Sequence, residues 1–152
     1  MEPQIVERPA FTVVGMPYRG RNEHNEIPAL WEQFVPRMGE IRHSPPATYG
    51  VMGNYDPGTA EFDYVAGVEA DPAAAVPEGM VRWDVPAGTY AAFRCSLNTL
   101  QQTFGEIYGT WLPGSGHRHA DAPEFEYHGA DYDPEDMDSP MYVYIPIEPG
   151  NR

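Results

Sequence analysis

The sequence contains no lysine, a single cysteine and no long apolar run, and each of these absences excludes a class of protein. Its 152 residues include 23 acidic and 9 basic side chains, and every basic one is an arginine, so the formal net charge is −14. A chain this acidic, with no basic run, is repelled by a phosphate backbone, and we expect no nucleic-acid binding. A negative surface instead favours cationic partners. Simple solubility is the alternative explanation of the charge.

The single cysteine, Cys95, excludes an internal disulfide framework and a cysteine-rich zinc site. Because it lies in an apolar segment, we expect a buried, unreactive thiol. No stretch approaches the roughly 20 apolar residues of a membrane helix. Residues 1–20 also lack the apolar core of a signal peptide. We therefore expect no membrane partner and a location in the cytoplasm.

Proline and glycine separate short segments along the whole chain, and the segments between them repeat one order. Alternation and helical spacing predict strand, helix, strand, strand, twice over. The first round has a strand over 5–18 bent at Pro9, a helix over 27–41, and strands over 47–55 and 61–69. The second has a strand over 80–95 broken at 86–88, a helix over 99–112 capped by Asn98, and strands over 124–129 and 141–147. Residues 71–77 are a connector, and the acidic segment 131–140 is a predicted loop.

An internal alignment of the sequence supports this repetition. An offset of 77 residues, which brings position 34 onto position 111, aligns Phe34-Val35-Pro36 with Trp111-Leu112-Pro113. It also aligns Tyr55-Asp56-Pro57 with Tyr132-Asp133-Pro134. We predict an α+β fold, a single domain over 1–152 made by tandem duplication of a β-α-β-β unit, with halves 1–75 and 78–152. A pseudo-twofold axis would relate the halves, with both helices on one face of the sheet and a ligand cleft on the other.

The richest chemical signal lies in the last two predicted strands. The last strand has its apolar residues at Val143 and every second position after it, so Tyr142 and Tyr144 point to the opposite face. We expect Glu126 to share that face with the two tyrosines. A carboxylate among aromatic rings is a good receptor for a flat or quaternary cation. A half-exposed sheet with a solvated glutamate is the alternative.

Two further aromatic residues are candidates for the same cleft. Trp111 comes near the end of the second predicted helix, where its ring can belong either to the core or to the cleft wall. Tyr49 is the residue that the 77-residue offset aligns with Glu126. A glutamate in one half and a tyrosine in the other would make a mixed aromatic and anionic cleft.

Neither the histidines nor the glycines indicate a metal or a cofactor. His117 and His119 have the spacing of a ligand pair, but the positive Arg118 lies between them, and we expect a solvated loop. The phosphate-binding patterns GxGxxG and GxxxxGK[ST] are absent, and Gly114-Ser115-Gly116 lacks the spacing of a nucleophile elbow. We therefore expect no metal and no cofactor.

Four motifs together resemble the GyrI-like small-molecule-binding domain, which is also the effector-binding domain of multidrug-sensing transcription regulators. They are EFDYVAGVE at 61–69, VPAGTYAAF at 85–93, IYGTWLP at 107–113, and FEYHG followed by YVYIPI. The resemblance spans residues 5–147 and implies the same duplicated fold. It carries the acid that contacts cationic ligands onto Glu126 and a cleft tyrosine onto Tyr144. Tyr142 stands where relatives often have a second acid.

The resemblance implies that the chain binds a hydrophobic, cationic small molecule, as an effector-binding or drug-sequestering protein. The first predicted segment already belongs to the duplicated unit, so we expect no helix-turn-helix and a free-standing form. Two alternatives stay open. Some members of the family hydrolyse strained cyclopropane rings in alkylating compounds, and Glu126 with Tyr142 or Tyr144 would supply that catalytic pair. A gyrase-inhibitor-like module that binds a protein partner is the other, for which the acidic surface is the only hint.

We predict that the chain does not bind DNA, because its net charge of −14 opposes association with phosphates. A gel-shift assay at low salt, where electrostatic binding is strongest, should give no retarded band at micromolar protein. A basic DNA-binding protein in the same buffer serves as the positive control. A retarded band for this chain would contradict the prediction.

Overall fold

The computed structural model describes residues 2–41 and 47–150, which form an α+β fold of one antiparallel sheet and two main helices. The strands are β1 (Gln4–Arg8), β2 (Phe11–Gly20), β3 (Thr48–Asp56), β4 (Glu61–Ala70), β5 (Val81–Val85), β6 (Gly88–Cys95), β7 (His117–His119), β8 (Glu124–His128) and β9 (Met141–Pro149). The first helix is α1 (Glu26–Phe34), which continues into the 3₁₀ helix η1 (Val35–Glu40). The second is α2 (Leu100–Glu106), which continues through the π-helical turn η2 (Ile107–Trp111) into α3 (Leu112–Gly114).

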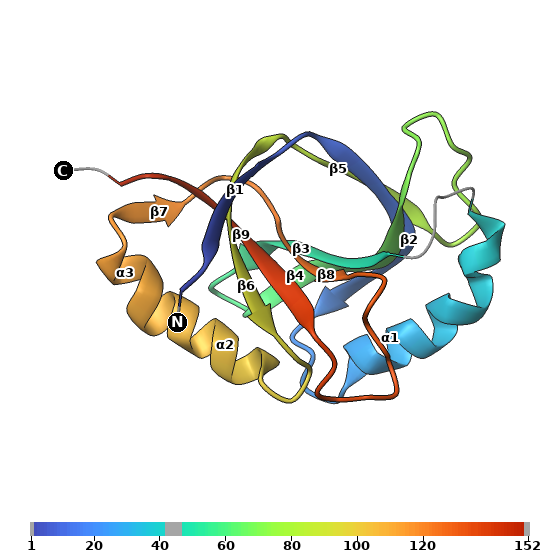
Figure 1. The fold of residues 1–152 in the computed structure, drawn as a ribbon. Coiled ribbons are helices and arrows are strands. Elements are labelled where there is room, and N and C mark those ends of the chain that lie inside the picture. The colour runs from blue at the N-terminus through green and yellow to red at the C-terminus, as the bar shows by residue number, and fades with distance from the viewer. Residues whose placement is uncertain (1, 42–46, 151–152) are drawn as a thin grey trace.

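The sheet has the strand order β1-β6-β9-β8-β3-β4-β2-β5, and β7 pairs with β9 (Figure 1). The middle pair, β3 with β8, joins the two predicted rounds through a ladder that runs from Thr48–His128 to Met52–Glu124. At the ends, β1 pairs with β6 of the second round, while β5 pairs with β2 of the first. The first strand of each predicted round therefore pairs with a strand of the other round.

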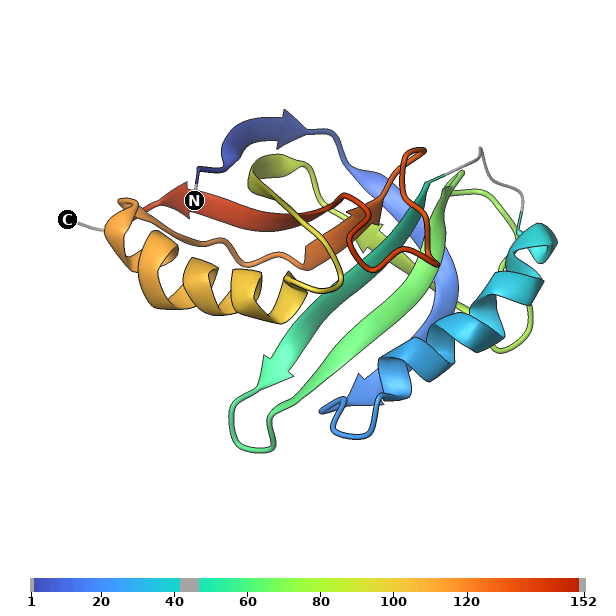
Figure 2. The same cartoon turned by 60° about the horizontal axis from the view of Figure 1, so that its bottom comes forward.

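Both helices cover the same face of the sheet, one on each side of the β3–β4 hairpin (Figures 1 and 2). α1 packs its buried Leu30 and Phe34 against a core that includes Ala66 of β4. Ile107, which follows α2, packs in a second core with Val143 of β9. These two cores lie on one face because the ladders place Val143 opposite Glu126, Glu126 opposite Gly50, and Gly50 opposite Ala66.

The opposite face carries a third core, over which β1 and β5 curve (Figure 1). Its buried members are Phe11, Val13, Tyr49, Val51, Val65, Val85, Tyr90 and Phe125. Packed aromatic and aliphatic side chains fill the middle of this face, and the ligand cleft expected here stays a prediction. Strands β2 and β4 are thus apolar on both faces, in agreement with their near-continuous apolar runs.

Several predicted elements need correction. The segment 5–18 forms two strands with different neighbours, β1 and β2, which are separated at Pro9. Asn98 does not cap the second helix, whose N-cap residue is Thr99; its side-chain amide instead donates to Asp138 Oδ1 at 2.7 Å. The segment 117–119 is not a solvated loop but strand β7, paired with β9. The acidic loop over 131–140 and the break after Val85 are confirmed.

The ladders repeat with nearly constant spacing along the chain. β2 and β4 pair Thr12 with Ala70, and β6 and β9 pair Thr89 with Ile147, which lie 77 residues later on both strands. At the centre of the β3–β8 ladder, the two residues that lie opposite each other are separated by 76 positions and not by 77. Gly50, at an offset of 76, lies directly opposite Glu126. Tyr49, which the constant offset aligns with Glu126, pairs instead with Tyr127 and faces the other side.

We predict that Gly15→Ala destabilises the fold, because a Cβ at Gly15 of β2 would lie 1.9 Å from the carbonyl oxygen of Ala66. The neighbouring atom is backbone and cannot move aside, so the free energy of unfolding should fall by about 1–3 kcal/mol in urea denaturation. Gly105→Ala, in α2, is the matched control, since a Cβ there meets nothing within 4 Å. Its stability should stay the same or rise. Equal losses in both variants would contradict the proposed close approach of the strands.

Candidate functional site

The carboxyl group of Glu126 is buried in the middle of the sheet, on the face that the helices cover. The residue is 8% exposed. Its Oε1 accepts a hydrogen bond from the Tyr64 hydroxyl at 2.9 Å, and that hydroxyl accepts one from Trp31 Nε1 at 2.9 Å. A chain of two hydrogen bonds therefore runs from α1 through β4 to a carboxyl group on β8.

Gly50 provides the space in which this chain forms. It lies opposite Glu126 on β3, and a Cβ there would lie 2.1 Å from the Tyr64 hydroxyl oxygen and 2.6 Å from Glu126 Oε1. Because any other side chain would displace both groups, the hydrogen bond between Tyr64 and Glu126 depends on a glycine at this position.

His128, two residues after Glu126, lies on the same face. Its Nε2 is 3.8 Å from Glu126 Oε1, and its Nδ1 is 3.1 Å from the Thr48 hydroxyl. Its ring packs edge-on against Trp31, with ring centroids 5.4 Å apart. It also contacts the tilted ring of Tyr132, with ring centroids 4.8 Å apart. Burial lowers the pKa of His128 to about 4, so the imidazole is neutral at neutral pH and supplies no countercharge.

Burial raises the pKa of Glu126 to about 7. The hydrogen bond from Tyr64 opposes this rise and the negative charge of Glu124 adds to it. Among residues 2–41 and 47–150, only the neutral His128 lies within ion-pairing distance of the carboxylate. At neutral pH the group is therefore divided between its neutral and its ionised form. A cation placed beside it would shift that balance toward the carboxylate.

The expectation that Glu126 shares a face with Tyr142 and Tyr144 is wrong. In the ladder between β8 and β9, Glu126 lies opposite Val143, whereas Tyr144 lies opposite Phe125 and Tyr142 opposite Tyr127. Directly opposite residues share a face, so both tyrosines point away from the helices. A hydrolytic pair made of Glu126 with Tyr142 or Tyr144 is therefore not formed.

The five residues expected in one cleft lie in three places. Glu126 is on the helix-covered face, while Tyr49 and Tyr144 belong to the core beneath β1, and Tyr142 is on their side of the sheet. Trp111 packs edge-on against Phe93, with ring centroids 5.1 Å apart, in the core of the second helix. Cys95 is buried as expected, and burial raises its pKa to about 12.

Sequence reasoning missed the residues that do surround Glu126: Trp31, Gly50, Tyr64, His128 and Tyr132. Tyr64 stands in the EFDYVAGVE motif, where alternation places it on one face with the apolar Ala66 and Val68. That signal was available. Nothing in the sequence indicates that its hydroxyl reaches a strand 62 residues away.

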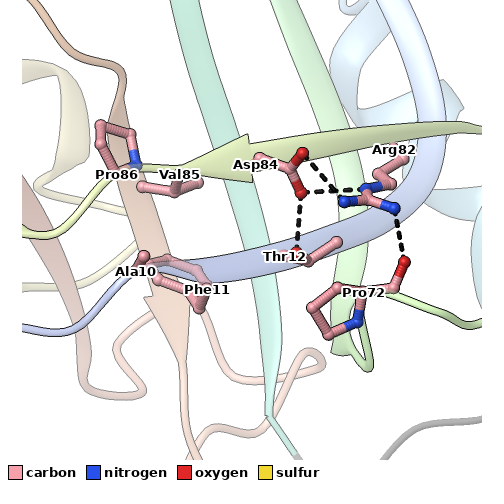
Figure 3. A pocket seen from close by; sticks show the side chains of 8 residues that line it. All are labelled: Ala10, Phe11, Thr12, Pro72, Arg82, Asp84, Val85 and Pro86. Atoms are coloured by element: carbon pink, nitrogen blue, oxygen red, sulfur yellow. Dashed lines mark hydrogen bonds and ion pairs between the residues drawn. The ribbon is translucent and has the colours of Figure 1, made fainter.

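Two open pockets lie elsewhere on the surface. The pocket between β2 and β5 has a volume of about 380 Å³ (Figure 3). Its polar groups already satisfy one another, because Asp84 pairs with Arg82 at 2.9 Å and accepts from Thr12 at 2.7 Å, and Arg82 also donates to the Pro72 carbonyl. The other, about 400 Å³, lies between α3 and β7 and includes Arg118, which pairs with Glu148. This second pocket is also lined by His117, whose Nδ1 is buried and has no hydrogen-bond partner among the described residues.

Over the part of the chain that the structure describes, no group of three or more histidine, cysteine, aspartate or glutamate side chains could hold a metal ion. Within the same residues, no helix is both long and apolar enough to span a bilayer.

Residues 4–147 match the family described as "Cass2: Integron-associated effector binding protein". The chain belongs to this effector-binding family. It is also 41% identical, over 97% of its length, to the transcriptional regulator BrlR of Pseudomonas aeruginosa. The chain spans 56% of that regulator, about half of its length. The resemblance to GyrI-like effector-binding domains is thereby confirmed.

Solved structures share the fold at low sequence identity. The protein SAV2435, in a structure bound to tetraphenylphosphonium, has a TM-score of 0.77 and 17% identity, with 97% of this chain and 94% of that one covered. The integron cassette protein VCH_CASS2 of Vibrio cholerae has a TM-score of 0.69 and 21% identity, with 97% and 96% covered. The C-terminal domain of EcmrR has a TM-score of 0.67 and 12% identity, with 97% and 98% covered.

We predict that Tyr64→Phe raises the pKa of Glu126 above its value of about 7, because it removes the hydrogen bond that favours the carboxylate. A titration of the side-chain carboxyl carbon by nuclear magnetic resonance measures this pKa directly. Tyr90→Phe is the matched control, because Tyr90 lies in the core of the other face and donates to the Pro86 carbonyl. An unchanged or lowered pKa in Tyr64→Phe would show that the hydroxyl does not donate to Glu126.

Proposed function

We propose that this chain binds a hydrophobic, cationic small molecule on the helix-covered face, with Glu126 as the countercharge and aromatic side chains as the walls. The observation that carries the proposal is a buried carboxylate that has no basic partner among the described residues. In a structural ion pair, an arginine of the chain would balance the charge of the carboxylate. In a recognition site, a cationic ligand takes the place of that arginine.

The aromatic residues around Glu126 suit such a ligand. Trp31, Tyr64 and Tyr132 surround the carboxyl group or its neighbour His128, and their rings attract a positive charge through their faces. A cation about 4 Å from the carboxylate gains on the order of 4 kcal/mol at an effective dielectric constant near 20, before desolvation. Binding would also remove the cost of an unpaired buried charge, so the carboxylate would favour cations over neutral molecules of the same shape.

The relatives support this choice of ligand class. SAV2435 has been solved with tetraphenylphosphonium, a monovalent cation whose phosphorus atom carries four phenyl groups. BrlR is a transcriptional regulator, and EcmrR has been solved in a complex with DNA. In this proposal the present chain performs the effector-binding part of such a regulator, or captures the ligand by itself.

We also propose that the two halves, 1–75 and 78–152, arose by tandem duplication and meet at this site. The equal spacing of the β2–β4 and β6–β9 ladders supports a duplication. So does the reciprocal placement of β1 and β5. Gly50 and Glu126 would then be equivalent positions on the pseudo-twofold axis. Only one of these two positions can carry a side chain, because the side chains of Glu126 and Tyr64 occupy the space beside Gly50.

We predict that Glu126→Gln weakens the binding of tetraphenylphosphonium by about 1–3 kcal/mol, or roughly 5- to 150-fold, because it removes the charge and keeps the shape. Isothermal titration calorimetry measures the loss. Neutral triphenylphosphine oxide should bind both proteins alike. Glu32→Gln, an exposed site on α1, is the matched control and should bind the cation like the unaltered protein.

The pH dependence gives the same test a second readout. With a pKa of about 7, Glu126 becomes ionised as the pH rises from 6 to 8, so the affinity for the cation should rise by up to about tenfold across that range. In Glu126→Gln this rise should be absent. If the affinity of Glu126→Gln for tetraphenylphosphonium is unchanged, or if both ligands weaken equally, Glu126 is not the countercharge.

A further inference from the structure

On the face opposite Glu126, four aromatic rings surround the guanidinium group of Arg8. Its Cζ atom lies 5.0 Å from the ring centroids of Phe11 and Tyr144, 5.2 Å from Phe125 and 6.0 Å from Tyr49. The rings come from four different strands, β2, β9, β8 and β3. All four distances fall within the range in which a cation is attracted by the face of an aromatic ring. We refer to these four rings as the Arg8 cage.

The cage also contains polar groups that fit a guanidinium ion. Arg8 Nη2 donates to the Tyr49 hydroxyl at 3.4 Å, and that hydroxyl donates to Glu69 Oε1 at 3.2 Å. The hydroxyl keeps its proton, because burial raises the pKa of Tyr49 to about 12. Ring faces, one hydroxyl acceptor and a carboxylate behind it therefore match the planar shape, the N–H groups and the charge of a guanidinium.

The walls of the cage are held in place without Arg8. Phe125 stacks on Tyr144 with centroids 4.8 Å apart, and Phe11 contacts Phe125 and Tyr49, each at 5.2 Å. Phe11, Tyr49 and Phe125 belong to the buried core of this face. Because these contacts join the rings to one another, the rings are held by packing contacts other than those with Arg8.

Arg8 itself is attached more weakly than the walls. It ends β1, a five-residue strand at the end of the sheet that pairs only with β6. The side chains of β1 are exposed or half-buried, and Ile5 is 51% exposed. A short edge strand with little buried area opens locally at low cost. The guanidinium of Arg8 is thus carried by the short strand β1, while the rings that surround it belong to the buried core or pack against it.

We propose that the Arg8 cage is a second cation-binding site, specific for alkylguanidinium ions, and that Arg8 is its internal occupant. A free alkylguanidinium, or an arginine side chain of a peptide, binds when β1 moves aside and competes directly with Arg8. A group on a short flexible tether acts at an effective concentration on the order of millimolar, so external ligands compete in that range. The site is independent of the function proposed above, because Glu126 lies on the other face of the sheet.

The decisive experiment compares the unaltered protein with Arg8→Ala in titrations with N-ethylguanidinium chloride. The ring signals of Phe11, Phe125 and Tyr144 are followed by nuclear magnetic resonance. Removing the internal competitor should tighten binding by about tenfold or more, with saturable shifts of these signals. Arg94→Ala, an exposed arginine on β6, is the matched control and should bind like the unaltered protein. Equal affinity in Arg8→Ala and the unaltered protein would overturn the proposal.

Further measurements separate this site from general effects. In Arg8→Ala, tetramethylammonium should bind more weakly than N-ethylguanidinium, because it has no N–H to donate to Tyr49; equal binding would refute the specificity for guanidinium. Glu126→Gln should leave binding in the cage unchanged, so failure of one site is distinguishable from failure of the other. If Arg8→Ala does not fold, the Arg8 Nε–H signal of the unaltered protein gives the answer. That signal should shift as ligand enters, and its constancy while the ring signals saturate would refute displacement.

Discussion

The antiparallel register between β3 and β8 decides which side chains the two helices cover. It places Gly50 opposite Glu126 and Tyr49 opposite Tyr127, and the neighbouring ladders extend these two rows across the sheet. One row holds the carboxyl group and its hydrogen-bonded partner Tyr64, and the other holds the aromatic rings beneath Arg8. A slip of one residue would exchange the rows, putting Tyr49 where only a glycine fits.

The same register explains why the sequence predicted the fold better than the site. Alternation correctly put Val143 and Tyr144 on opposite faces of the last strand. It could not say which face of β8 lies beside which face of β9, because a strand with side-chain period two fits either way until its partner is known. Glu126 was assigned to the wrong side because the register between β8 and β9, which pairs it with Val143, was not known. Here the acid is buried and the neighbouring Phe125 lies in a core as well, so polarity did not distinguish the two faces.

Features set by local chemistry were predictable, and those set by distant partners were not. Helical spacing predicted both helices, and prolines marked the ends of β1 and β5. The capping role given to Asn98 failed: Thr99 is the N-cap residue, and the Asn98 amide donates to Asp138, in a loop 40 residues away. β7 was missed because a three-residue strand has too short a pattern to recognise and exists through its pairing with β9. The four rings around Arg8 come from four strands, so no spacing in the sequence reveals them.

The link between Trp31 and Tyr64 has a consequence for how the domain would communicate. The indole of α1 donates to the hydroxyl that in turn donates to the carboxyl group of Glu126. When that carboxyl group gains or loses a proton, the second hydrogen bond changes strength, and the first changes with it, because hydrogen bonds in a chain polarise one another. Two hydrogen bonds therefore connect α1 to an ionisable group in the middle of the sheet. A change in the charge of Glu126 is therefore transmitted to α1 through two hydrogen bonds and not through the packing of the core alone.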